Sequence, residues 1–255
     1  MLLGLDSGLS PRRPTSSAVS FADAVAADSP YLWAKMDETS GTVMANSGSY
    51  STVGTYNGGV TINQPSLFND SGKSIILDGA TDWCGFTTAA YSDMNATRWT
   101  LEFIMSRPAD AAGECIWHTG DSGAAGSAGY MVHCQGSGEI DVQGYAGGAW
   151  RQALSVGLAL PGDGTVNIIA IRFDSVLGTV RFFKNGSLVN EAAWAGGNSN
   201  RNVADLVKIG IREHMDAIYA NSYLNASLDD VIYWNDTAGV SEARLLVHAQ
   251  AAGLA

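Results

Sequence analysis

The sequence predicts an all-β protein, a two-sheet antiparallel jelly-roll sandwich with one short helix near each end of the chain. Glycine makes up 30 of the 255 residues, which indicates many turns. Short runs of β-branched and aromatic residues alternate with turn signals along most of the sequence. A chain of this length buries about 70–75% of its unfolded surface and needs no disulfide or metal to fold.

Residues 1–18 differ in composition from the rest of the chain. Pro11, Arg12, Arg13 and Pro14 lie in a Ser/Thr-rich stretch, and the two prolines favour an extended, irregular backbone. Two interpretations remain open, a loose terminus and an arm that docks on a neighbouring subunit. We therefore divide the chain into a 1–18 extended arm and a 19–255 jelly-roll domain.

Helix and strand signals follow in order. Residues 21–27 have helix-forming composition, with Ser20 as the N-cap and Ser29-Pro30 as the end. The expected strands include 99–105, 166–173, 178–184, 207–211, 222–228 and 230–234. In the first of these, alternation places Trp99 and every second residue on one face. Asn185-Gly186 predicts a tight hairpin turn, and Ser241 to Gly253 predicts a second helix.

Charge and composition exclude several classes of protein. The formal charge of −11 disfavours nucleic acid or an anionic membrane as the main partner. No apolar run reaches the 18 or so residues of a membrane span. The three cysteines have no framework spacing, and no secretion signal is visible, so we expect assembly in a cytoplasm.

Four ordered segments carry a resemblance to a known family. They are residues 27–42 with 54–60, residues 75–83, the hairpin from 168 to 189, and residues 223–234 with 240–244. In this order they resemble a concanavalin A-like jelly-roll domain of the laminin G-like kind, as found in bacteriophage virion structural proteins. The resemblance implies a domain without enzymatic activity.

The residues around Glu139 resemble part of a hydrolytic site. Alternation places Glu139, Asp141 and Gln143 on one face of a strand, as the carboxylates of laminarinase-like glycosidases on this fold are placed. A retaining glycosidase needs two carboxylic groups, one as nucleophile and one as acid/base. Gln143 stands where the acid/base would be, so we expect an ordinary strand with outward polar side chains. Glycoside hydrolysis stays a remote alternative.

Two sets of residues have side chains that can bind metal ions. Cys115, His118, His133 and Cys134 have zinc-ligand side chains, but strict alternation would point Cys115 and His118 to opposite faces, as it would His133 and Cys134. Calcium prefers hard oxygen ligands, and many domains of the resembled family hold it at a rim. The candidates for such a site are Asp78, Asp82, Asp229 and Asp230.

A glycan-binding surface needs an aromatic plane beside polar groups. The candidate loop contains Tyr145, Trp150 and Arg151, with Tyr130 as a further candidate. The alternative is that Trp150 begins a strand and packs inward.

The resulting prediction is a non-enzymatic phage virion surface protein, decorating the capsid or forming part of the tail. Its arm would attach it to other virion proteins, with Arg12 and Arg13 pairing with carboxylates there. Binding of a host-surface glycan is compatible with this role. A carbohydrate-binding module for adhesion is the alternative.

Overall fold

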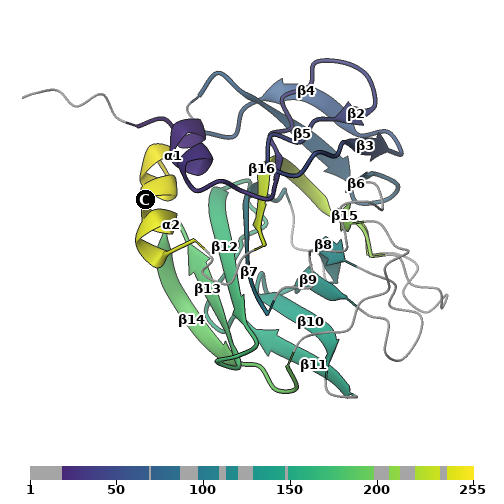
Figure 1. Ribbon diagram of the computed structural model, residues 1–255. Helices are drawn as coiled ribbons and strands as arrows, with labels where there is room; N and C mark the ends of the chain where they lie inside the picture. Colours follow the sequence, from purple (N-terminus) through teal and green to yellow (C-terminus); the bar gives the residue numbers. More distant parts are fainter. Residues whose placement is uncertain are drawn as a thin grey trace, which may run out of the picture.

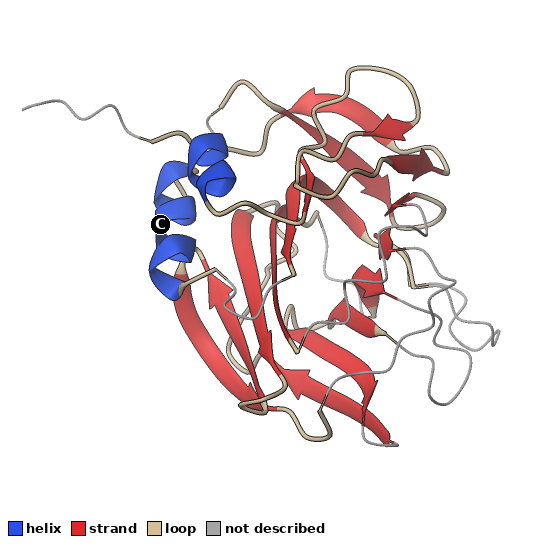
Figure 2. Cartoon of the chain, viewed as in Figure 1, coloured by secondary structure: helices blue, strands red, loops and turns tan. Residues whose placement is uncertain are grey.

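The computed structural model describes residues 19–68, 70–86, 97–108, 113–119, 129–146, 149–197, 207–212, 222–235 and 240–255. Within them two antiparallel sheets face each other, and two helices cover the outer face of one sheet (Figures 1 and 2). The predicted jelly-roll sandwich is confirmed. The predicted arm, with Pro11, Arg12, Arg13 and Pro14, lies outside the described residues. None of the described helices has the length and hydropathy that crossing a lipid bilayer requires.

Sheet A is the sheet that the helices cover. Its strand order is β14 (Ser187–Ala193), β13 (Thr179–Lys184), β12 (Val166–Asp174), β7 (Arg98–Ser106), β16 (Asn225–Trp234), β5 (Lys73–Asp78) and β4 (Thr61–Pro65), and β1 (Leu32–Ala34) also pairs with β16. The turn between β13 and β14 has positive φ angles of 52° at Asn185 and 76° at Gly186, as the predicted hairpin requires.

Sheet B faces sheet A across the core. Its strand order is β11 (Ala149–Leu154), β10 (Ile140–Ala146), β9 (Tyr130–Cys134), β8 (Glu114–Thr119), β15 (Val207–Ile209), β6 (Trp83–Phe86), β3 (Gly54–Asn57) and β2 (Val43–Met44). The core between the sheets includes Trp99, Leu101, Phe103 and Met105, which strand β7 points inward as predicted. Ile104, on the opposite face of β7, packs in a second apolar cluster beneath the helices.

The two strands expected at residues 222–228 and 230–234 are one continuous strand, Asn225–Trp234, which corrects the prediction. A β-bulge between Asp229 and Val231 lets β16 continue without a break, and Asp230 takes a φ of +45° there. A bulge adds one residue to one strand and shifts the alternation beyond it. The alternation of apolar and polar residues is therefore interrupted at Asp230, although the strand is continuous there.

The helices α1 (Phe21–Ala27) and α2 (Glu242–Ala251) begin at their predicted N-caps. Ser20 accepts a hydrogen bond from the backbone N–H of Asp23, and Ser241 accepts one from that of Arg244. The helices lie side by side on the outer face of sheet A (Figure 1). Phe21 and Leu245 belong to the apolar cluster beneath them.

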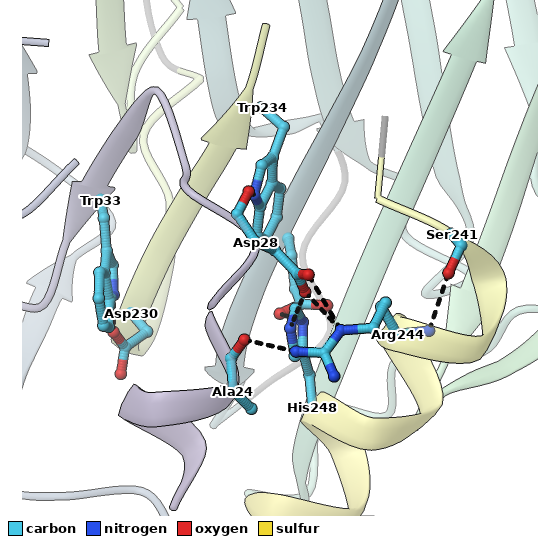
Figure 3. A network of polar contacts seen from close by, with 9 residues as sticks. Ala24, Asp28, Trp33, Asp230, Trp234, Ser241, Arg244 and His248 are labelled. Atoms are coloured by element: carbon cyan, nitrogen blue, oxygen red, sulfur yellow. Dashed lines mark hydrogen bonds and ion pairs between the residues drawn. The ribbon is translucent and has the colours of Figure 1, made fainter. Parts of the chain in front are cut away.

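A buried polar network joins both helices to sheet A (Figure 3). His248 on α2 contacts Glu102 of β7 through Nδ1 at 3.0 Å and Asp28 through Nε2 at 2.9 Å. Arg244 donates to Asp28 from Nε at 2.9 Å, and from Nη2 to the carbonyl of Ala24 at 2.8 Å. We call Asp28, Glu102, Arg244 and His248 the helix latch. Burial lowers the pKa of His248, but the two carboxyl groups outweigh it and raise that pKa overall.

Candidate functional site

The outer face of sheet B carries polar side chains in place of the apolar ones on its inner face. Along β10, Ile140 and Val142 belong to the core, whereas Asp141 and Gln143 point to the other side. Asp141 pairs in register with His133 on β9. Side chains that are paired directly across two strands share one face of the sheet. His133 and Asp141 are therefore neighbours on the outer face.

A bulge on β8 adds a third residue to this row and corrects a prediction. The register shifts between Cys115 and Trp117, so that Cys115 pairs with His133 and His118 pairs with Met131. His133 and Met131 lie two residues apart on one face, so Cys115 and His118 share that face as well. The expectation that Cys115 and His118 point to opposite faces was wrong, because it assumed unbroken alternation. Cys134 lies in the core, as its position next to His133 requires.

Asp141 is the centre of the polar cluster. Its side chain is 0% exposed, and Oδ2 accepts hydrogen bonds from Nε2 of Gln135 at 2.8 Å, Gln143 at 2.7 Å and Gln152 at 2.5 Å. Oδ1 lies 3.6 Å from Nδ1 of His133. Three amide donors on one carboxylate compensate for the loss of water around the buried charge. The polar side chains expected to point outward here do so, and they form a buried hydrogen-bonded cluster around Asp141.

Cys115, His133 and Asp141 are the residue types of a nucleophilic triad, but their electrostatics oppose that chemistry. Burial raises the pKa of the Cys115 thiol, and Sγ contacts the carbonyl of Trp117 at 3.6 Å. Burial also lowers the pKa of His133 to about 4. A nucleophilic cysteine needs a lowered pKa and access to a substrate. Among the described residues, no group of three or more His, Cys, Asp or Glu side chains could hold a metal ion.

The cluster reaches the surface at the edge strand β11. Trp150 is 46% exposed, and Gln152, two residues later, is also exposed. Alternation places both on the outer face, since Ala153 between Gln152 and Leu154 points into the core. Gln152 pairs with Gln143 in register, and Trp150 pairs with Tyr145. The side chain of Tyr145 lies outside the described residues. The indole of Trp150 therefore stands beside two glutamine amides.

Two of the predicted glycan-binding residues lie elsewhere. Tyr130 is 4% exposed and its ring packs against Trp99 and Phe173 in the core, so it is not available to a ligand. Arg151 alternates with Trp150 and so points to the other side of β11. Its Nε donates to the carbonyl of Ala146 at 3.3 Å. The structure thus removes Tyr130 from the candidates and brings in Gln143 and Gln152.

The first pair of calcium candidates serves the backbone. Asp78 accepts hydrogen bonds from the backbone N–H groups of Ala80, Thr81 and Asp82, and the N–H of Thr81 contributes most to lowering its pKa to about 2. Asp82 is buried and accepts from the N–H of Gly59 at 2.6 Å. Such bonds are the usual role of aspartate in turns.

The second pair sits at the bulge of β16. Asp229 accepts hydrogen bonds from the Ser66 hydroxyl at 2.8 Å and the Leu67 backbone N–H at 2.9 Å. Asp230 accepts one from the Trp33 indole N–H (Figure 3). Burial raises the pKa of Asp229 to about 7, and that of Asp230 well above its ordinary value. These bonds fasten strand β1 and the segment after β4 to the last strand.

A hollow lies elsewhere on the surface, lined by Asn46 and residues 48–53. Asn46 uses its side chain to build this loop. Its Oδ1 accepts from the backbone N–H groups of Trp33 and Gly48, and its Nδ2 donates to the carbonyl of Tyr50. The hollow is thus a competing location for a ligand, but the side-chain oxygen of Asn46 and one of its amide N–H groups already bind the loop itself.

Comparison with known proteins identifies a family match. The laminin G model of the concanavalin A-like lectin/glucanases superfamily matches residues 78–243. A search of curated proteins finds none that matches the chain.

Solved structures share the fold at low sequence identity. The binding domain of Paraclostridial mosquitocidal protein 1 is 12% identical with a TM-score of 0.64, over 87% of this chain and 52% of that one. A binding domain of botulinum neurotoxin DC in complex with rat synaptotagmin II is 10% identical with a TM-score of 0.63, over 88% and 51%. A structure of botulinum neurotoxin type C is 11% identical with a TM-score of 0.62, over 88% of this chain and 51% of that one. Its name states that cell entry of this toxin depends on interaction with two ganglioside molecules. The chain spans about half the length of these structures.

Proposed function

Because the chain belongs to the concanavalin A-like lectin/glucanases superfamily, we propose that it is a non-catalytic binding module for glycans. Its binding face is the exposed edge of sheet B, formed by Trp150, Gln143 and Gln152. The observation that carries this proposal is the half-exposed indole of Trp150 beside two amides that a buried carboxylate holds in place.

The chemistry of this edge fits a sugar. A pyranose ring presents an apolar face of C–H groups, which packs on an aromatic plane, and a rim of hydroxyls that needs hydrogen-bonding partners. Trp150 supplies the plane, and Gln152 on the same strand supplies a polar group two residues away. Amides fixed before binding lose less conformational entropy when they contact a ligand.

The solved relatives support the binding role. The names of similar structures describe binding or receptor-binding domains, one of them in complex with rat synaptotagmin II. A further name states that cell entry of botulinum neurotoxin type C depends on interaction with two ganglioside molecules. The raised pKa of the buried Cys115 thiol, which keeps it protonated beside His133 and Asp141, supports a module without nucleophilic chemistry.

A glycan array with the wild-type chain and the Trp150→Ala variant tests the proposal. The wild-type protein should bind a subset of the array, and loss of the indole should weaken that binding by about 10–100-fold. Leu177→Ala is the matched control, because Leu177 is an exposed apolar residue on the hairpin between β12 and β13. Glycan binding that survives Trp150→Ala unchanged would remove this edge as the binding face.

We also propose a location for the module, the surface of a bacteriophage particle, on the capsid or the tail. Support comes from the sequence resemblance and from the Pro/Arg/Ser composition of residues 1–18. Mass spectrometry and electron microscopy of the purified source particle test it. Hundreds of copies would indicate a capsid decoration protein, and a few copies at one vertex would indicate a tail protein. Absence of the chain from the particle would refute the location and leave a cellular adhesion module.

An arm variant tests how the module attaches. If Arg12 and Arg13 pair with carboxylates of other virion proteins, replacing both by alanine should lower the occupancy of the chain on the particle. Full occupancy of the double variant would contradict the attachment role of the two arginines.

A further inference from the structure

One buried carboxylate turns three glutamine amides the same way. Nε2 of Gln135, Gln143 and Gln152 donates to the same oxygen of Asp141. A carboxylate oxygen accepts hydrogen bonds, so each glutamine must present its NH₂ end to Asp141, and its carbonyl oxygen points elsewhere. Among the described residues, none donates to these three carbonyl oxygens. We call the three glutamine side chains the amide platform.

The amide platform stands over the buried carboxylate of Asp141. His133 lies 3.6 Å from Asp141, and Arg212, which follows β15 on the side of β8 away from β9, acts electrostatically on His133 and Cys115. Burial keeps the pKa of His133 at about 4, so its ring is neutral at pH 7. Arg151 belongs to the edge strand but faces the other side of it and contacts Ala146. A ligand on Trp150 thus meets carbonyl oxygens backed by a carboxylate.

We propose that the amide platform makes this site selective for neutral sugars over sugars that carry a carboxylate or a sulfate, with Asp141 as the positioning residue. The inference rests on the proposed glycan-binding function and adds the class of ligand. Sugar hydroxyls donate to the carbonyl oxygens of the glutamines. An anionic group would face hydrogen-bond acceptors and the charge of Asp141, and Coulomb repulsion at the partly exposed edge should weaken its binding at least about tenfold.

Paired oligosaccharides that differ in one charged group test the selectivity. Lactose-terminated chains are compared with their sialylated counterparts, and galacto-oligosaccharides with oligogalacturonates, by calorimetric titration at low salt. The neutral member of a bound pair should bind at least about tenfold more tightly, and the gap should narrow at high salt. If the acidic member binds as tightly as the neutral one or more tightly, and Trp150→Ala abolishes that binding, the selectivity is overturned but the glycan-binding function stands. Binding that Trp150→Ala does not change, or no binding to any glycan, would overturn the function itself.

Two variants and a control assign the selectivity to Asp141. Asp141→Asn removes the charge and offers a competing amide, so the tenfold gap should fall to within about threefold. Glu139→Gln makes the same charge change two residues earlier, where Glu139 accepts a hydrogen bond from Ser137, and should keep the gap. Gln152→Lys changes an exposed residue and puts a cation on the platform, so the acidic member should gain at least about tenfold relative to the neutral one. An unchanged gap in both folded Asp141→Asn and Gln152→Lys would overturn the role of the platform.

Discussion

Replacing His248 by alanine should destabilise the protein strongly, because His248 is the central residue of the helix latch. Its side chain is fully buried and contacts two carboxyl groups that come from different parts of the chain. Glu102 on β7 is itself 1% exposed. The substitution leaves this carboxyl buried without its partner. It also removes a ring that stacks on Trp234 at 5.8 Å (Figure 3).

The magnitude follows from these contacts. Hydrogen bonds to charged groups contribute about 1.5–3 kcal/mol each to the free energy of unfolding. Removing one partner of a buried ion pair typically costs about 3–5 kcal/mol. We therefore expect His248→Ala to lower the free energy of unfolding by about 3–5 kcal/mol. For a chain of this size, each kcal/mol corresponds to about 2–4 °C in Tm.

Urea unfolding followed by tryptophan fluorescence at pH 6.5 measures this loss. Gln250→Ala is the control on the same helix, because Gln250 is exposed, and it should change the free energy by no more than about 0.5 kcal/mol. In a double-mutant cycle with Glu102→Leu, the combined loss should be at least about 1 kcal/mol smaller than the sum of the single losses. A loss below about 1 kcal/mol for His248→Ala, or strict additivity in the cycle, would refute the latch.

Three further predictions concern stability. Burial lowers the pKa of His133 to about 4, so between about pH 4 and 6.5 the unfolded chain binds a proton at His133 that the native state lacks, whereas the raised pKa values of Asp229 and Asp230 act in the opposite direction. The unfolding free energy of the wild type minus that of His133→Asn should therefore rise with pH in this window, and a difference that does not change with pH would contradict the burial of His133. Gly186→Ala should lose at least about 1 kcal/mol more than Gly164→Ala in calorimetry, because both have positive φ but an added Cβ meets another backbone only at Gly186; equal losses would contradict the steric argument. Glu114→Ala should cost about 3–5 kcal/mol in urea unfolding, since it strands buried Arg107, and Arg107→Met should restore part of it; no recovery would count against a buried ion pair.

The sequence was sufficient for elements whose start and end depend on local chemistry. Ser20 and Ser241 cap their helices because each hydroxyl can accept from a backbone N–H three residues later. Asn185-Gly186 forms the predicted turn because both residues tolerate positive φ. The inward face of β7 was predicted correctly, since no bulge interrupts its pairing with β12.

Bulges and long-range pairing set the limit of prediction. The extra residue of the bulge at Ile116 places Cys115 and His118 on one face, and the bulge at Asp230 lets β16 continue as one strand. Neither leaves a mark in a pattern that assumes alternation. The burial of Tyr130 depends on contacts with Phe173 and Trp194, which lie far away in the sequence.

The candidate site was predictable only in part. Trp150 was identified from the sequence, and its exposure agrees with a surface role. Asp141 was noticed, but only as a possible partner in hydrolysis. Its actual neighbours, Gln135 and Gln152, are brought together by the register of three strands. A glutamine after β9 and another on β11 give no local signal that they share one carboxylate.

The most direct test of the central claim is an NMR titration of the isotopically labelled chain with a glycan that the array identifies. The account predicts that the indole N–H of Trp150 and the side-chain amides of Gln143 and Gln152 shift with the same Kd, and Trp150→Ala assigns the indole signal among the seven tryptophans. The indole signals of the core tryptophans should stay in place. Signal shifts confined to Asn46 and residues 48–53, with the Trp150 signal unchanged, would contradict the account and place the ligand in the hollow that those residues line.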